Sequence, residues 1–163
     1  MNISKKPWYL SLFKGEGRIL IIPTIDHKYG YSIDADWFRN VNDLNDYKGI
    51  GEGILEGIEY IKVTPVSTLT PKERDEVAAW KKNSKYKSWI SFWRNNNHAF
   101  FCDKGKEGYV IRSTERIEKP RGGYNGCIKE IQLPLDASAE EIGKAVIDVF
   151  DVAEEYFAKL EKK

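Results

Sequence analysis

The first part of the chain contains two runs of apolar, aromatic and β-branched residues, which predict strands. They cover residues 7–13 (PWYLSLF) and the stretch that begins at Arg18 and ends near residue 23, with the glycine-containing turn KGEGR between them. A third, shorter strand is expected at residues 28–33 (KYGYSI). Connections this short favour antiparallel pairing of neighbouring strands.

An amphipathic helix is predicted at residues 47–63 (YKGIGEGILEGIEYIKV). Its isoleucines stand at positions 50, 54, 58 and 61, so they share one face, while Glu52 and Glu56 belong to another. Gly53 and Gly57 lie four residues apart and line up along the helix. Because a glycine inside a helix costs about 1 kcal/mol relative to alanine, this pair predicts a close approach by another backbone element.

The second half of the chain repeats the order of strands followed by a helix. A short helix should begin at Pro71, with Thr70 and Glu73 as a capping box, and strands are expected at residues 86–94, 97–103, 107–117 and 126–133. A long helix is predicted from about residue 139 to residue 161, with an apolar stripe at Ile142, Val146, Val149, Ala153, Phe157 and Leu160. The predicted fold is therefore α+β, with antiparallel sheets in a strand-then-helix arrangement that occurs twice and a long C-terminal helix packed on the sheet.

The segment YKSWISFWRNNNHAFF (residues 86–101) holds six aromatic side chains. If its first half is a strand, Trp89 and Trp93 lie on one face and Phe92 on the other, which favours a central strand buried on both sides, with RNNN as a tight turn. The alternative is an exposed platform on which the bases of single-stranded nucleic acid stack. The excess of 14 lysines and arginines over 7 acids between Lys72 and Lys129 is compatible with that alternative.

The composition is that of one globular domain spanning residues 1–163. Hydrophobic residues make up 41% and the net charge is +1, so charge alone gives no general attraction to nucleic acid or membranes. No apolar run is long enough to span a bilayer, and the first ten residues lack the pattern of a signal peptide. Cys102 and Cys127 match no metal motif and are expected to be reduced, half-buried thiols. We therefore expect a cytoplasmic protein that folds without metal or cofactor.

The sequence contains none of the common catalytic or nucleotide-binding motifs. The stretch GIGEG lacks the spacing of a dinucleotide fingerprint, and phosphate-binding-loop, zinc-protease and serine-hydrolase motifs are not found. His27 and His98 are the only histidines, and a pair of histidines can cleave RNA by acid–base catalysis, which leaves a small ribonuclease as a minor hypothesis. Because neither lies in a motif, surface or turn positions are expected for both. The pattern indicates a binding protein.

An acidic segment runs from Asp34 to Glu59, with seven acids against Arg39 and Lys48. The simpler interpretation is a solvated loop and helix face. The alternative is a docking surface for a basic partner, because aromatic residues lie among the acids, as in interfaces where aromatic anchors stand inside a charged rim. The residues expected at this surface are Asp34, Asp36, Trp37, Asp43, Asp46, Tyr47, Glu52 and Glu56.

In its layout, and in the stretches WISFWRNNN and LPLDASAEEIGKAV, the sequence resembles the CdiI-type immunity proteins of bacterial contact-dependent growth inhibition. The resemblance covers most of the chain. It implies a protein that binds the C-terminal toxin domain of a cognate secreted effector, often an RNA-cleaving nuclease, and blocks its active site. Some such proteins are similar to Whirly-like folds. The resemblance carries over no catalytic or binding residue, so the docking residues named above rest on charge alone.

Two hypotheses of different classes follow. The first is a non-enzymatic immunity protein that binds and neutralises a toxin domain, expected to be a basic nuclease acting on RNA. The alternative is a module that binds single-stranded nucleic acid through an aromatic sheet face.

Overall fold

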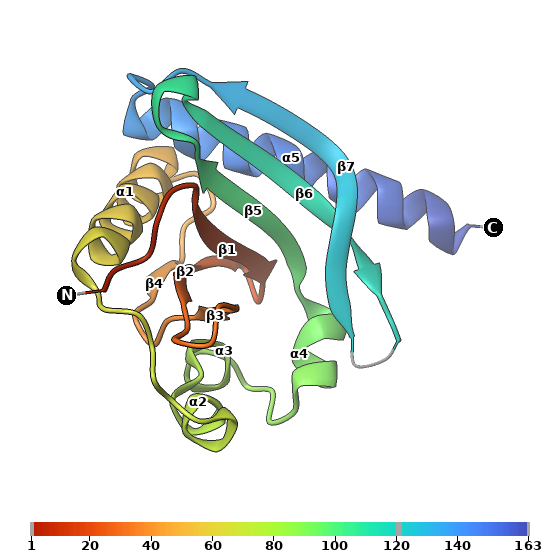
Figure 1. Cartoon of the computed structure of the whole chain (residues 1–163). Coiled ribbons are helices and arrows are strands. Elements are labelled where there is room, and N and C mark those ends of the chain that lie inside the picture. The colour runs from red at the N-terminus through yellow and green to blue at the C-terminus, as the bar shows by residue number, and fades with distance from the viewer. Residues whose placement is uncertain (1, 120–121, 163) are drawn as a thin grey trace.

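The computed structural model describes residues 2–119 and 122–162, which form one seven-stranded antiparallel sheet flanked by helices (Figure 1). The strands are β1 (Trp8–Gly15), β2 (Arg18–Asp26), β3 (Ser32–Asp34), β4 (Arg39–Val41), β5 (Asn97–Asp103), β6 (Tyr109–Ile117) and β7 (Gly123–Leu133). The helices are α1 (Tyr47–Val63), α2 (Pro71–Val77), α3 (Ala79–Lys82), α4 (Trp89–Asn95) and α5 (Ala139–Glu161). The predicted α+β class, with strands followed by a helix in each half of the chain, is confirmed.

The two halves of the chain meet in the middle of the sheet. The strand order is β3-β2-β1-β5-β6-β7, and β4 pairs separately with β2. β1 pairs with β5 in an antiparallel register that sets Leu10 opposite Phe101. The first hairpin turns at Glu16 and Gly17, which both have positive φ, a conformation that favours glycine at the second position.

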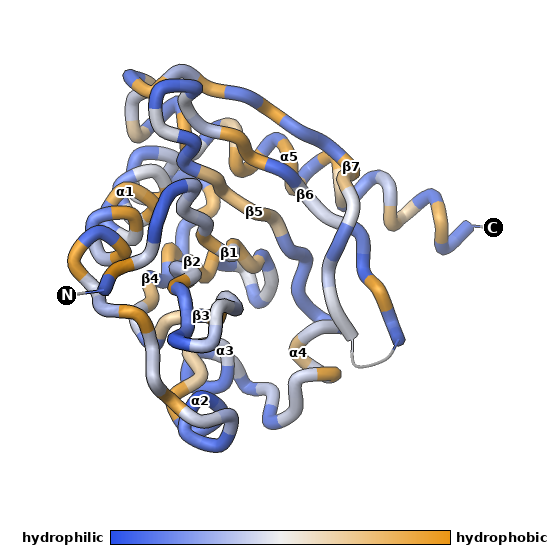
Figure 2. The backbone as a smooth tube through the Cα atoms, viewed as in Figure 1, coloured by the Kyte–Doolittle hydropathy of each residue, from blue (hydrophilic) through white to orange (hydrophobic). Residues whose placement is uncertain are grey.

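The main core lies between one face of the sheet and the helices α1 and α5. Leu10 and Leu12 of β1, Phe101 of β5 and Ile111 of β6 point into it and are fully buried. Figure 2 shows apolar positions of α1 and α5 alternating with polar ones, as expected for helices with one buried side. The predicted isoleucine face of α1 is confirmed, and so is the first part of the α5 stripe, but Phe157 is only half-buried and Leu160 is exposed.

Helices α1 and α5 approach each other so closely that only glycine fits at the contact. A Cβ atom on Gly51 would collide with the backbone carbonyl of Ala139, and one on Gly143 would collide with the backbone carbonyl of Tyr47. The predicted pair, Gly53 and Gly57, instead faces side chains of the sheet. The close backbone approach therefore exists, but it occurs two residues earlier than the sequence pattern indicated.

The predicted strand at residues 86–94 is wrong, because α4 occupies residues 89–95. Ser88 caps this helix by accepting a hydrogen bond from the backbone N–H of Ser91. Phe92 is buried in a second, smaller core on the other face of the sheet, together with Phe13, while Trp93 is buried beside Gly122. The asparagines after α4 form no hairpin turn: Asn96 ends the helix and Asn97 begins β5.

Other predicted elements need smaller corrections. The strand expected at residues 28–33 is confined to β3, because the chain turns back at Gly30, where the backbone N–H bonds to His27. The capping box of α2 forms as predicted from Thr70 and Glu73. Both cysteines are free thiols, with Cys102 buried and Cys127 exposed.

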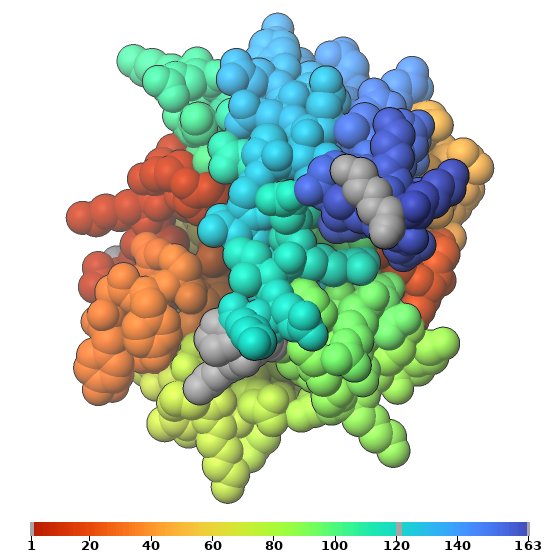
Figure 3. All heavy atoms as spheres, turned by 90° about the vertical axis from the view of Figure 1, so that its right-hand side faces the viewer, coloured from red at the N-terminus to blue at the C-terminus, as the bar shows by residue number. Residues whose placement is uncertain are grey.

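Strand β7 lies at an edge of the sheet and pairs with β6 along a ladder that is interrupted by a register shift between Ser113 and Glu115. Figures 1 and 3 show the β6–β7 pair running along α5, on the opposite side of the molecule from the N-terminus. Extra residues in one strand of a pair, as in a β-bulge, bend the strands and increase their twist. Beyond the region covered by α3 and α4, this curved part of the sheet leaves some of its second face open.

Candidate partner-docking surface

The exposed side of α1 carries the acids that the sequence placed in a docking surface. Glu52, Glu56 and Glu59 are all solvent-exposed, on the side opposite the buried isoleucines. All three have basic neighbours: Glu56 is bonded to Arg39, Glu59 is bonded to Lys62, and Glu52 lies 3.7 Å from Lys48. A partner with a basic surface would therefore exchange these ion pairs for its own, which keeps the net gain from each exposed pair small.

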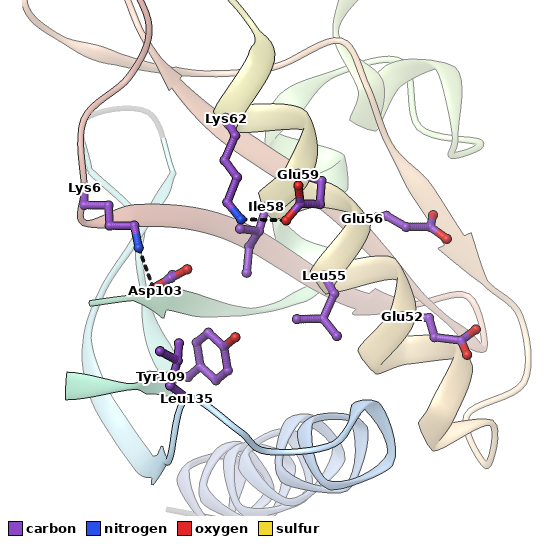
Figure 4. Close-up of a pocket in the computed structure, with 10 residues that line it drawn as sticks. All are labelled: Lys6, Glu52, Leu55, Glu56, Ile58, Glu59, Lys62, Asp103, Tyr109 and Leu135. Carbon is purple, nitrogen blue, oxygen red and sulfur yellow. Dashed lines mark hydrogen bonds and ion pairs between the residues drawn. The ribbon is translucent and has the colours of Figure 1, made fainter. Parts of the chain in front are cut away.

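A groove of about 700 Å³ borders this acidic helix (Figure 4). It lies between α1, the N-terminal segment and the strands β5 and β6, and its lining includes the apolar residues Leu55, Ile58, Tyr109 and Leu135. Figure 4 shows Leu55 pointing from α1 toward Tyr109, whereas Glu52 and Glu56 project to the outer side of the helix. Apolar surface bordered by charge is the usual anatomy of a protein interface.

The groove has more acids than bases at its rim. Glu52, Glu56 and Glu59 join Asp103, against Lys6 and Lys62. Lys62 donates a 2.6 Å hydrogen bond to Glu59, and Lys6 lies 3.9 Å from the buried carboxylate of Asp103. Glu52 and Glu56 are paired in turn with Lys48 and Arg39, so each rim acid has a basic neighbour, and a basic partner would exchange these ion pairs for its own.

Asp36 and Trp37 contact α1 through Tyr60, outside the groove. The carboxylate of Asp36 accepts a 3.2 Å hydrogen bond from the hydroxyl of Tyr60, and the Trp37 ring stacks on the Tyr60 ring at a centroid distance of 5.8 Å. Burial, and to a smaller extent the nearby Asp36 carboxylate, raises the pKa of Tyr60. The loop before β4 is thus fastened to α1, and Asp36, Trp37, Glu52 and Glu56 belong to one side of the molecule.

The acids at the start of α1 accept hydrogen bonds from the local backbone. Asp46 is the N-cap and accepts a 2.9 Å hydrogen bond from the backbone N–H of Gly49, while Asp43 accepts one from Asn45. Tyr47 lies under the ammonium group of Lys144, which stands 5.9 Å from its ring. Because an N-cap contributes about 1 kcal/mol to a helix, Asp46 is not simply the solvated loop acid that its sequence context suggests.

Asp34 is separated from the rest of the predicted set. It ends β3 and lines a hollow on the other face of the sheet, beside His98 and Tyr124. The structure therefore brings together Asp36, Trp37, Glu52 and Glu56, places Asp43, Asp46 and Tyr47 at the start of the same helix, and leaves Asp34 on the opposite side. The groove residues Leu55, Tyr109 and Leu135 were missed, because they come from three distant parts of the sequence.

Both histidines are buried, whereas the sequence predicted surface or turn positions for them. His98 lies in β5 with 3% of its surface exposed, and its two ring nitrogens lie within hydrogen-bonding distance of the hydroxyls of Thr114 and Ser11. Burial lowers the pKa of His98 to about 3. His27 precedes a turn, but it is also buried, with its ring nitrogens bonded to backbone atoms of Leu69 and Tyr29. All four ring nitrogens are therefore engaged within the protein.

Within the described residues, no group of three histidines, cysteines or acids is placed to hold a metal ion. None of the helices in the described part of the chain has the length and apolar character needed to cross a membrane.

Comparison with known proteins gives a likeness of fold. No family model matches the chain, and no curated protein sequence matches it. The structure is similar to a protein of unknown function from Neisseria meningitidis, with a TM-score of 0.62 and 13% identity, over 93% of this chain and 98% of that chain. It is also similar to a chain of the CdiA-CT/CdiI toxin and immunity complex from Yersinia pseudotuberculosis, with a TM-score of 0.61 and 13% identity, over 91% of this chain and 98% of that chain.

Proposed function

We propose that this protein is a non-enzymatic immunity protein of a contact-dependent growth inhibition system, which binds and neutralises a toxin domain in the cytoplasm. The observation that carries the proposal is the shared fold with a chain of a toxin–immunity complex, which extends over nearly the whole of both chains. The resemblance of the stretches WISFWRNNN and LPLDASAEEIGKAV to CdiI-type immunity proteins agrees with it.

The docking surface that we propose is the groove beside α1 together with its acidic border. Leu55 and Leu135 offer apolar contact area, and Glu52 and Glu56 add negative charge next to it. A nuclease that binds RNA must present basic groups near its active site. Carboxylates of an inhibitor can pair with those basic groups in place of the RNA phosphates. This surface therefore fits a basic nuclease toxin that acts on RNA.

The structure removes part of the basis of the two other hypotheses. The stacking alternative rested on the aromatic side chains of residues 86–101: Phe92 and Trp93 are buried, and the indole N–H groups of Trp89 and Trp93 donate to backbone carbonyls, while Trp89 and Phe100 line an open hollow. The ribonuclease hypothesis needed two available histidines, yet the ring nitrogens of His27 and His98 are bonded within the protein.

The proposal is tested by co-expressing the tagged chain with the C-terminal domain of the protein that the adjacent upstream gene encodes. We expect the two proteins to elute as one complex and cells that carry both genes to survive expression of the toxin domain. A catalytically inactive toxin domain serves as the binding partner where the active one kills the host. The proposal fails if that domain does not associate with the chain and cells carrying both genes die as fast as those with the toxin domain alone.

A further inference from the structure

A hollow of about 330 Å³ opens on the face of the sheet opposite α1 and α5. Five of its eleven lining residues are aromatic: Phe13 of β1, Trp89 of α4, His98 and Phe100 of β5, and Tyr124 of β7. A volume of this size falls in the range of small-molecule sites in proteins. Neither the toxin-docking proposal nor the fold itself accounts for an open aromatic hollow at this place.

The aromatic walls are held in fixed orientations. The Tyr124 ring stacks on His98 at a centroid distance of 4.5 Å and meets the edge of Trp89 at 6.2 Å, with an interplanar angle of 89°. The Tyr124 hydroxyl donates to the backbone carbonyl of Asn96 at 3.0 Å, and the Trp89 indole N–H donates to that of Gly122 at 2.7 Å. Rings fixed in this way need little reordering when a ligand enters, which favours binding.

A single acid, Asp34, stands at the wall of this hollow, and it has no ion-pair partner among the residues that the structure describes. Its carboxylate reaches solvent, but the surrounding protein removes part of its hydration and raises its pKa to about 6. The other titratable groups in the lining are His98, which burial keeps neutral at pH 7, and Tyr124, whose pKa burial raises. On the side of α2, Arg74 and Asp75 line an adjoining hollow that also includes Asp34.

An unpaired carboxylate beside aromatic faces has the chemistry of a cation-binding site. Aromatic rings attract a cation through their negative faces, and the attraction grows as water is excluded. A guanidinium group suits the walls better than an ammonium group, because it is planar, stacks on rings and matches a carboxylate with two parallel hydrogen bonds.

We propose that this hollow is a binding site for a guanidinium group, which contacts the carboxylate of Asp34 and stacks against the aromatic walls formed by Trp89, Phe100 and Tyr124. The site is independent of the proposed toxin docking, since it lies on the opposite face of the sheet from the groove beside α1. The group can come from free arginine or from an arginine side chain of a protein. The two sources share the chemistry but differ in the charges around the α-carbon.

The test titrates the protein with two probes, free L-arginine and the blocked peptide acetyl-Gly-Arg-Gly-amide, followed by tryptophan fluorescence and by amide NMR shifts. We expect saturable binding with a Kd on the order of 1 mM, as a single charged contact with stacking provides. Tighter binding of the free amino acid points to a metabolite, and tighter binding of the peptide points to a protein side chain. The blocked lysine peptide should bind several-fold more weakly than the arginine peptide.

Three variants separate the site from non-specific attraction. Asp34→Asn should weaken binding of the preferred probe at least tenfold, and Phe100→Leu should weaken it several-fold. Asp136→Asn, which makes the same chemical change at an exposed carboxylate outside the hollow, should leave binding unchanged. Affinity for the wild-type protein should rise between pH 5 and pH 7 as Asp34 ionises, and this rise should be absent in Asp34→Asn.

The proposal is overturned if neither probe binds the wild-type protein at concentrations up to about 20 mM, which is well above the Kd expected for one such contact. It is also overturned if Asp34→Asn binds as the wild type does, or if Asp136→Asn loses as much affinity as Asp34→Asn. Thermal unfolding of each variant establishes that it is folded before its binding is compared. Toxin protection by Asp34→Asn reports separately on the proposed function.

Discussion

The indole Nε1 of Trp93 donates a hydrogen bond of 2.6 Å to the backbone carbonyl of Gly123 and so fastens α4 to β7. Trp89, one turn earlier, bonds to Gly122 in the same way. The short helix α4 therefore closes the smaller core through two ring N–H groups as well as through apolar packing. Both links reach the beginning of β7, the strand at the edge of the sheet.

Replacing Trp93 should show how much the attachment of α4 to β7 contributes to the free energy of unfolding. Trp93→Ala removes a buried ring and should lower the free energy of unfolding by about 3–5 kcal/mol. Trp93→Phe keeps apolar contact but leaves the Gly123 carbonyl without this donor, so a loss of about 1–2 kcal/mol is expected. Urea unfolding measures both, with Arg94→Ala, an exposed position on the same helix, as the control. A Trp93→Ala protein as stable as the wild type would show that the link between Trp93 and Gly123 does not stabilise the fold.

The glycine contact between α1 and α5 predicts an unusual response to alanine. In an open helix position, glycine to alanine stabilises a protein by up to about 1 kcal/mol. Gly143→Ala should instead lower the free energy of unfolding by about 1–3 kcal/mol, because its Cβ would press on the backbone of Tyr47 and force the helices apart. Gly123→Ala is the control, since a Cβ there meets no atom within 4 Å. Equal stability of the two variants would contradict the close crossing.

His98 makes the fold sensitive to acid. Its pKa is about 3 in the folded protein against 6.5 ordinarily, so the unfolded chain takes up the proton first. The stabilising contribution of neutral His98 is complete above pH 6.5 and is lost as pH falls toward 3, at up to about 1.4 kcal/mol per pH unit. Asp34 acts in the opposite direction: with its pKa raised to about 6, the folded protein gains stability as pH falls from 6 toward 3.8.

The two effects are separated by measuring urea unfolding from pH 7.5 to pH 4.5 in an Asp34→Asn background. Adding His98→Gln, which keeps a donor and an acceptor but cannot be protonated in this range, should flatten the dependence on pH. The single Asp34→Asn protein should lose stability below pH 6.5 more steeply than the wild type. An unchanged slope after His98→Gln would mean that this ring does not control the acid transition.

Charge reversal on α1 tests the docking surface. Glu52→Lys together with Glu56→Lys should slow association with the toxin about tenfold or more and weaken its dependence on salt, because charges at an interface rim act mainly on the rate of encounter. Both side chains are exposed, so the melting temperature should change little. Lys119→Glu, an exposed position in the β6–β7 connection, is the matched control. If Lys119→Glu impairs association and the α1 reversals do not, the toxin docks elsewhere.

The elements with strong periodicity and capping were predictable from the sequence. The bounds of α1 and α5 follow from apolar spacings of three and four residues, with capping side chains at Asp46 and Ser138. Residues 86–94 were misread because aromatic residues favour strands, although Trp89, Phe92 and Trp93 also have helical spacing and Ser88 is a good N-cap. In this segment tertiary packing and a local cap outweighed strand propensity.

The candidate site was predictable only in part. Charge clustering identified the acids near α1, since they are close together in the sequence. It could not reveal that Asp34 would face the other side, because that depends on the register of β3 against β2, where Asp34 lies opposite Thr24. The groove beside α1 joins the N-terminal segment, α1, β5, β6 and the residues after β7, and no local pattern encodes such a meeting.

The pairing of β1 with β5 at the middle of the sheet has a consequence during synthesis on the ribosome. The paired residues Leu10 and Phe101 are roughly 90 positions apart, so one edge of β1 stays unpaired until the second half of the chain emerges. α1 can pack on β1 and β2 as soon as these elements are made, but its contact with α5 forms later, because α5 follows all seven strands in the chain. The nascent chain therefore carries an open edge on β1 until β5 is made, and the close crossing of α1 and α5 forms only after every strand of the sheet has been synthesised.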